Sequence, residues 1–145
     1  MLLAPPARFA ATDQLRQERT HATQQKQINE LHQREQLENL KRAQELNKTQ
    51  RQLDQLRYQA ARHPDLAAPL REQQLNEMQR QLDQLKNDQQ RNQLQHELQL
   101  NQLEREHNPI RRQEQLRDLQ FQQQMQFLQD QSRTKLLQQE LHRLR

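Results

Sequence analysis

Basic side chains recur along the first third of the chain at spacings that place them on one face of a helix. Seven or eight residues separate successive members of the set Arg19, Lys26, Arg34, Lys41 and Lys48. Such a row on a rigid rod could follow the phosphates of a nucleic acid, and the sequence pI of about 10.0 agrees. The net charge is only +4, however, and Tyr58 is the single tyrosine for base stacking. Nucleic-acid binding is therefore the alternative function, and a solvated helix face is the simpler interpretation.

Two pairs of histidines have the spacing of residues on one helix face. His21 and His32 are 11 residues apart, as are His96 and His107. Eleven residues are about three helical turns, so the members of each pair are separated by about 16 Å. One metal ion cannot bridge that distance. We expect surface histidines and no metal site.

The residue types needed for catalysis are scarce. The chain has no cysteine and no glycine, and Ser132 is its only serine. Without cysteine there is no thiolate nucleophile, and without glycine there is no tight phosphate-binding loop or oxyanion turn. We expect no enzyme, no cofactor and no small-molecule substrate.

Composition indicates the elements that must carry these side chains. Of 145 residues, 34 are Gln, and the hydrophobic fraction is 30%. Leu, Gln, Glu, Arg and Lys are good helix formers, and a narrow seam between helices needs only about two apolar residues in seven. Disorder is the competing interpretation of so polar a chain. The regular spacing of the leucines favours an all-α fold of long amphipathic helices in an antiparallel helical hairpin or coiled coil, with no β-structure.

Prolines divide the chain into segments. We expect a first helix over residues 12–62 with Thr12 as N-cap, a turn over 63–69, and a second helix over 70–107. Asn108 and Pro109 supply the N-cap and first position of a third helix over 108–145. A proline kink in one continuous helix would look the same in the sequence, so the choice between turn and kink is open.

The first eleven residues are apolar and contain two prolines. We expect a disordered tail over residues 1–11, with the end of a truncated signal peptide as the alternative. The compartment is left open: cytoplasmic by default, and periplasmic or secreted if the tail is such a remnant. No stretch approaches the roughly 18 apolar residues of a membrane helix, so no membrane span is expected.

An internal repeat predicts how the first two helices pair. Residues 42–57 reappear as residues 71–86, 29 positions later. Folding the chain back at the turn of residues 63–69 brings the two copies together in antiparallel order. Duplication and drift in a Gln- and Leu-rich sequence is the alternative explanation. The predicted seam consists of Leu46, Leu53, Leu56, Leu75, Met78, Leu82 and Leu85.

The last helix is apolar on two opposite sides. A helix of this kind needs neighbours on both sides, which argues for self-association or a docked helical protein. We therefore expect a spacer, adaptor or assembly factor that acts through helix–helix contacts. Its predicted C-terminal interface consists of Phe121, Met125, Leu128, Leu137 and Leu141.

Overall fold

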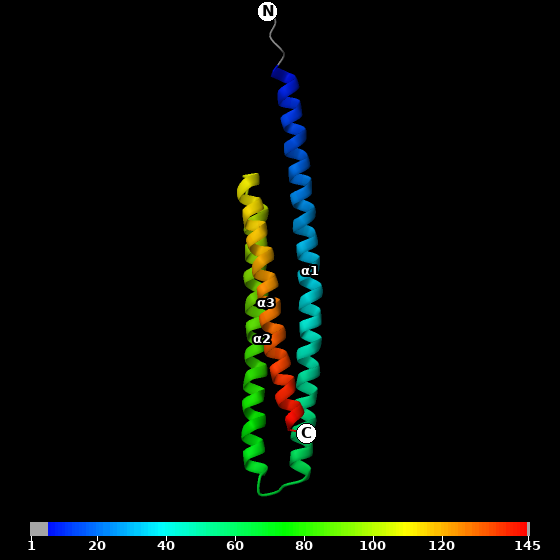
Figure 1. Cartoon of the computed structure of the whole chain (residues 1–145), viewed down its shortest axis with the longest axis vertical. Coiled ribbons are helices and arrows are strands. Elements are labelled where there is room, and N and C mark those ends of the chain that lie inside the picture. The colour runs from blue at the N-terminus through cyan, green and yellow to red at the C-terminus, as the bar shows by residue number, and fades with distance from the viewer. Residues whose placement is uncertain (1–5, 145) are drawn as a thin grey trace, which may run out of the picture.

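The computed structural model describes residues 6–144, with side chains from residue 11 onward, and it confirms the all-α fold. Three helices follow one another: α1 (Pro6–Arg62), α2 (Ala68–Arg105) and α3 (Pro109–Arg143) (Figure 1). No strand occurs within residues 6–144. The three long helices form a bundle that extends the expected hairpin by one helix.

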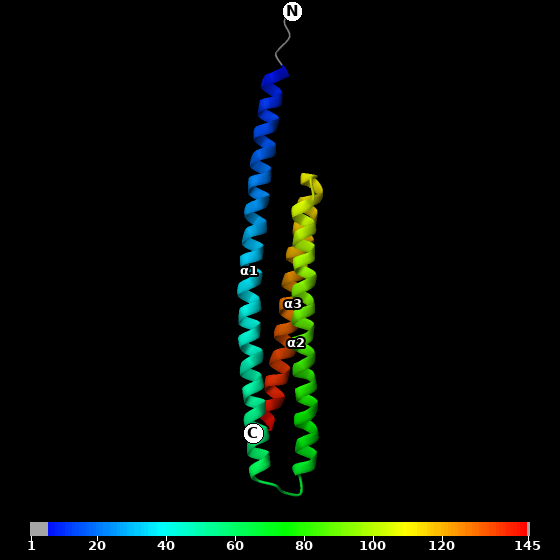
Figure 2. The same cartoon turned by 180° about the vertical axis from the view of Figure 1, so that it is seen from behind.

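Each helix packs against both of the others. The chain reverses after α1 and again after α2, so α2 is antiparallel to its neighbours while α1 and α3 run parallel (Figures 1 and 2). The Gln24 amide donates to the Pro109 carbonyl at 2.8 Å, which fixes where α3 starts beside α1. The part of α1 that precedes Gln24, here called the overhang, extends beyond the α2–α3 turn (Figures 1 and 2).

Local polar contacts shape the two reversals. In the first, the Asp65 carboxylate accepts from the Ala67 backbone N–H at 3.0 Å and also pairs with Arg71. In the second, Asn108 accepts from the Ile110 N–H at 3.0 Å and caps α3. The proline that follows holds Asn108 in an extended conformation, with φ −81° and ψ 117°. Pro109 therefore begins a new helix after a turn, and it does not kink a continuous one.

Helix boundaries differ from the sequence expectation by a few residues, most at the N-terminus. The first helix begins at Pro6, so residues 6–11 of the expected disordered tail are helical; residues 1–5 lie outside the described part. Proline is tolerated in a first helical turn, and the alanines that follow favour helix. The second helix spans 68–105 where 70–107 was expected, and the third spans 109–143 where 108–145 was expected. Residue 145 also lies outside the description.

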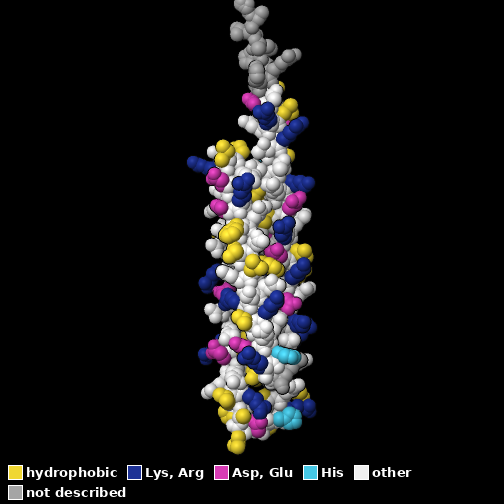
Figure 3. Space-filling view, viewed as in Figure 1, with side chains coloured by type: hydrophobic (Ala, Val, Ile, Leu, Met, Phe, Trp, Pro, Cys, Tyr) yellow, Lys and Arg dark blue, Asp and Glu magenta, His cyan; other side chains and the backbone are white. Residues whose placement is uncertain are grey.

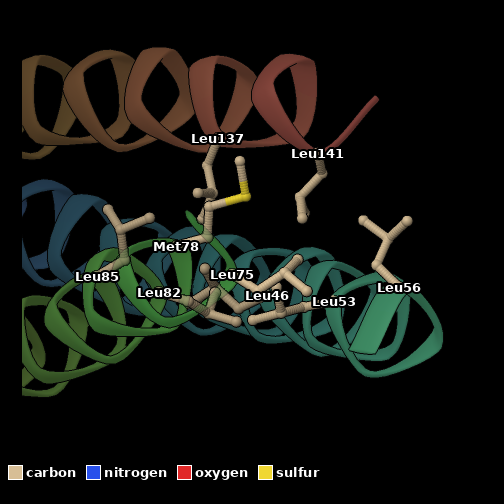
Figure 4. Close-up of a cluster of buried hydrophobic side chains, with 9 residues drawn as sticks. All are labelled: Leu46, Leu53, Leu56, Leu75, Met78, Leu82, Leu85, Leu137 and Leu141. Atoms are coloured by element: carbon tan, nitrogen blue, oxygen red, sulfur yellow. The ribbon is translucent and has the colours of Figure 1, made fainter. Parts of the chain in front are cut away.

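Two hydrophobic clusters fill the bundle. The first cluster lies toward the α1–α2 turn, and Figure 4 shows the Leu137 and Leu141 side chains pointing from α3 toward leucines of α1 and α2. The second cluster lies toward the α2–α3 turn. The first comprises Leu46, Leu53, Leu56, Leu75, Met78, Leu82, Leu85, Leu137 and Leu141, and the second Ile28, Leu31, Leu100, Leu103, Leu116 and Leu119.

Polar residues occupy the interior between the two clusters. His96 Nδ1 and the Glu35 carboxylate form a buried pair at 2.9 Å. Arg42 donates to Asp130 at 3.1 Å and lies over the Phe127 ring. The expectation of a surface histidine is thus wrong for His96, because α1 covers it. We call this layer the polar waist; it consists of Glu35, Arg42, Gln89, His96, Gln123 and Asp130.

Candidate association surface

The outside of the bundle is apolar at the level where its inside is polar. Leu37 and Leu40 lie between Glu35 and Arg42 in α1, yet both are more than half exposed. The same arrangement occurs in α2 and α3, where apolar side chains near the polar-waist residues face solvent. The exposed apolar side chains of the three helices at this level are Leu37, Leu40, Leu94, Leu98, Phe121, Met125 and Leu128.

Helical geometry explains why these side chains face solvent. Successive residues are rotated by about 100°, so Leu37 and Leu40 point about 160° and 140° away from Glu35, which is buried. Because a bundle helix buries only one face, a residue opposite that face has no neighbour within the chain. Figure 3 shows hydrophobic side chains gathered near the middle of the bundle, over the visible face of α2 and α3. These surfaces are available for contact with another molecule.

The longest such surface is a continuous stripe on α3. Its positions are separated alternately by four and three residues, which is the spacing of a heptad seam. Its centre is apolar, with Phe121 63%, Met125 44% and Leu128 50% exposed. Charged residues flank this centre. We call this set the outer stripe; it comprises Glu114, Asp118, Phe121, Met125, Leu128, Ser132 and Lys135, all exposed.

The structure divides the expected C-terminal interface between two faces of α3. Phe121, Met125 and Leu128 belong to the outer stripe. Leu137 and Leu141 are only 3% and 2% exposed and pack in the first cluster, so their assignment to an external interface is wrong. The reason is that the groove between α1 and α2 takes up one apolar face of α3 and leaves the other outside.

All seven predicted seam residues lie in the first cluster. They come from α1 and α2, in the antiparallel order that folding back at residues 63–67 produces. The sequence reasoning missed that α3 closes the same cluster with Leu137 and Leu141. The signal was present, because these two leucines are four residues apart and therefore share a helix face. The spacing alone could not show that these leucines pack against α1 and α2.

The five residues of the predicted basic stripe are all exposed along α1. The fold adds basic residues to its end, because α3 brings Lys135, His142 and Arg143 beside Lys48 around a groove of about 570 Å³. None of the described residues lining this groove is a carboxylate. Glu45 lies near its edge and accepts from Gln138 at 3.0 Å. The groove is thus a second candidate surface, suited to an anion.

One carboxyl in the polar waist has a shifted pKa. Burial raises the pKa of Asp130, Arg42 and Arg133 lower it, and Asp88 adds a further increase, with burial the largest effect. Asp130 is bonded to Arg42 and its side chain is 15% exposed. The layer beneath the outer stripe therefore carries an electrostatic cost in the folded state.

The described residues also bear on metal binding and on membrane spanning. No group of three or more His, Asp or Glu side chains there is arranged to hold a metal ion. None of the three helices, over the same residues, contains a stretch both long and apolar enough to cross a bilayer. His21 instead accepts a hydrogen bond from Arg112 at 2.7 Å, joining α1 to the start of α3.

Comparison with known proteins gives no relative: no protein-family model, no curated protein and no solved structure matches the chain.

Proposed function

We propose that this protein is non-enzymatic and acts by helix–helix association, as a spacer, adaptor or assembly factor. This proposal rests on the outer stripe of α3. Its four-and-three spacing is that of a coiled-coil seam, and its apolar centre is exposed in the isolated chain. The partner is a second copy of the chain or another helical protein.

The position of the apolar side chains supports this function. A chain selected only for stability as a monomer gains from apolar residues inside and polar residues outside. At the polar waist the order is reversed: Glu35 and His96 are buried, while Leu37, Leu94 and Phe121 are each more than half exposed. Burying exposed apolar area stabilises by about 25 cal/mol per Å². A partner helix laid on the outer stripe would recover that free energy.

A site-specific photo-crosslinker tests the proposal. A benzophenone amino acid replaces Phe121 in the outer stripe, or Leu66 in the α1–α2 turn as a control, since Leu66 is fully exposed but lies outside any stripe. We expect irradiation of cells that make the protein to join the Phe121 variant, and not the Leu66 variant, to a defined helical chain identified by mass spectrometry. Equal labelling from both positions, or none from Phe121, would contradict the proposed function.

The groove between α1 and α3 favours a second candidate, an electrostatic nucleic-acid binder. Lys48, Lys135 and Arg143 converge there, and Lys41 continues the row along α1. Such binding is expected to be sub-micromolar at low salt and to weaken steeply as salt rises. Replacing Arg34, Lys41 and Lys48 with Glu should abolish it. Retained oligonucleotide affinity in this variant, measured by fluorescence anisotropy, would exclude the stripe as the site.

A further inference from the structure

We infer that the partner of the outer stripe is a second copy of this chain, bound antiparallel through α3 about a two-fold axis at Met125. This inference rests on the proposed function and specifies its partner. Three observations carry it: the symmetry of the apolar centre, the charges at the two ends of the stripe, and the shorter apolar stripes on the other helices.

The apolar centre is self-complementary in antiparallel order. Phe121 lies four residues before Met125 and Leu128 lies three after it. When two α3 helices cross at Met125, the Met125 side chains meet, and Phe121 of each copy faces Leu128 of the other. A two-fold interface requires this reciprocity, in which each residue of a pair contacts the other from both sides. Both apolar layers flanking the axis are thereby filled.

The ends of the stripe carry opposite charges at matching distances from the axis. Glu114 lies eleven residues before Met125 and Lys135 lies ten after it, so each Glu114 faces a Lys135 of the second copy. Asp118 faces the small Ser132 in the layer between. Both Glu114 and Lys135 are exposed, and neither forms an ion pair within residues 11–144. The antiparallel dimer therefore gains two equivalent ion pairs.

Parallel pairing of the same stripe is disfavoured by the same charges. In that order Glu114 would face Glu114, Asp118 would face Asp118, and Lys135 would face Lys135. Like charges opposite one another in a helical seam are destabilising. The charge pattern thus selects the antiparallel dimer.

The outward faces of α1 and α2 fit less well. Each presents only two leucines at this level, Leu37 with Leu40 and Leu94 with Leu98. On α1 these leucines lie beside the cations Arg34 and Lys41, which would repel the same face of a second copy. Over residues 11–144, α3 alone combines three apolar layers with charged ends that complement themselves.

Sedimentation equilibrium of the purified full chain tests the inference. We expect a monomer–dimer equilibrium in the wild type. The double substitution Phe121→Gln with Met125→Gln should weaken the dimer about a hundredfold or more, because both copies lose two buried apolar side chains. The matched control is Leu94→Gln with Leu98→Gln, which removes two side chains from α2 that are 64% and 63% exposed. Circular dichroism at 222 nm confirms that each variant stays helical.

Charge exchange tests the orientation. Glu114→Lys or Lys135→Glu alone should weaken the dimer about tenfold, since each change places like charges at two sites, and the two together should restore it. A Met125→Cys variant should form a disulfide-linked dimer under mild oxidation, whereas Leu98→Cys should not, and the native chain has no cysteine to interfere.

The outcomes separate this inference from the proposed function. A dimer that loses affinity in the α3 variants and regains it on charge exchange supports both. A dimer indifferent to Phe121 and Met125, or a monomer at every concentration, overturns the α3 dimer. The proposed function still stands in those cases if the Phe121 photo-crosslinker captures a different helical protein. It falls together with the inference if Phe121 captures nothing.

Discussion

Gln50 and Gln79 exchange side-chain hydrogen bonds in both directions, with amide nitrogen to oxygen distances of 2.8 and 2.9 Å. They occupy the same position in the two copies of the internal repeat, 29 residues apart. A residue that meets its own equivalent across an antiparallel pair lies on a local two-fold axis. The repeat is therefore the sequence counterpart of a pseudo-symmetric α1–α2 hairpin, and the glutamine pair marks its centre.

A thiol crosslink across this pair should form within one chain. We expect Gln50→Cys with Gln79→Cys to be joined by a short bismaleimide, because their side chains already touch and no native cysteine competes. The product should run as a compact monomer in denaturing electrophoresis. The control, Gln50→Cys with Leu98→Cys, places the thiols about 28 Å apart along the bundle and should not react internally. Covalent dimers from the first variant would show that the hairpin exchanges between chains.

Substituting the centre of the first cluster should destabilise the fold. Leu53 and Leu82 are 1% and 0% exposed. Replacing both with Gln removes two buried apolar side chains and leaves amides in the core, each change costing about 2–5 kcal/mol. Tm should fall by several degrees or more in a circular dichroism melt. Leu66→Gln, on the exposed turn, serves as the control. An unchanged Tm in the double variant would show that the seam does not stabilise the fold.

The buried pair of Glu35 and His96 should behave as a unit. Their side chains are 8% and 6% exposed, and the second polar atom of each finds no partner among the described residues. Removing one partner, as in Glu35→Ala, should cost about 1–3 kcal/mol in urea unfolding, because a polar atom of the other is left buried and unpaired. Replacing both with Leu should be neutral or stabilising. A double variant weaker than either single variant would show that the pair itself stabilises the bundle.

Asp130 should make stability rise in acid. Because burial raises its pKa above the ordinary 3.8, the folded state binds the proton more tightly than the unfolded chain. The contribution of Asp130 to the free energy of unfolding is complete below its ordinary pKa and is lost as the pH rises through its pKa in the folded state. The Tm of the wild type relative to Asp130→Asn should therefore increase from about pH 6 to about pH 3.5. Asp13→Asn, on the exposed overhang, is the control substitution. Parallel Tm curves for the wild type and Asp130→Asn would contradict the effect.

The sequence by itself determined the helices and their order of reversal. The chain lacks glycine, is rich in helix formers and has prolines near residues 64 and 109, and each of these features acts on the backbone nearby. The sequence therefore predicted three helices, with boundaries that differ by a few residues except at the N-terminus. The repeat also predicted that α1 and α2 pair in antiparallel order. The helices depend on residues that are neighbours in the sequence, and their antiparallel pairing depends on the internal repeat.

Only the tertiary structure decided what each face of a helix meets. The two apolar faces of α3 have similar composition, and packing against α1 and α2 determined that Leu137 and Leu141 are buried while Phe121 and Met125 are exposed. Likewise, His96 is buried because α1 places Glu35 opposite it, and the sequence around His96 does not show this. Periodicity reports which residues share a face, but burial depends on the neighbour that covers the face, and that neighbour comes from distant parts of the chain.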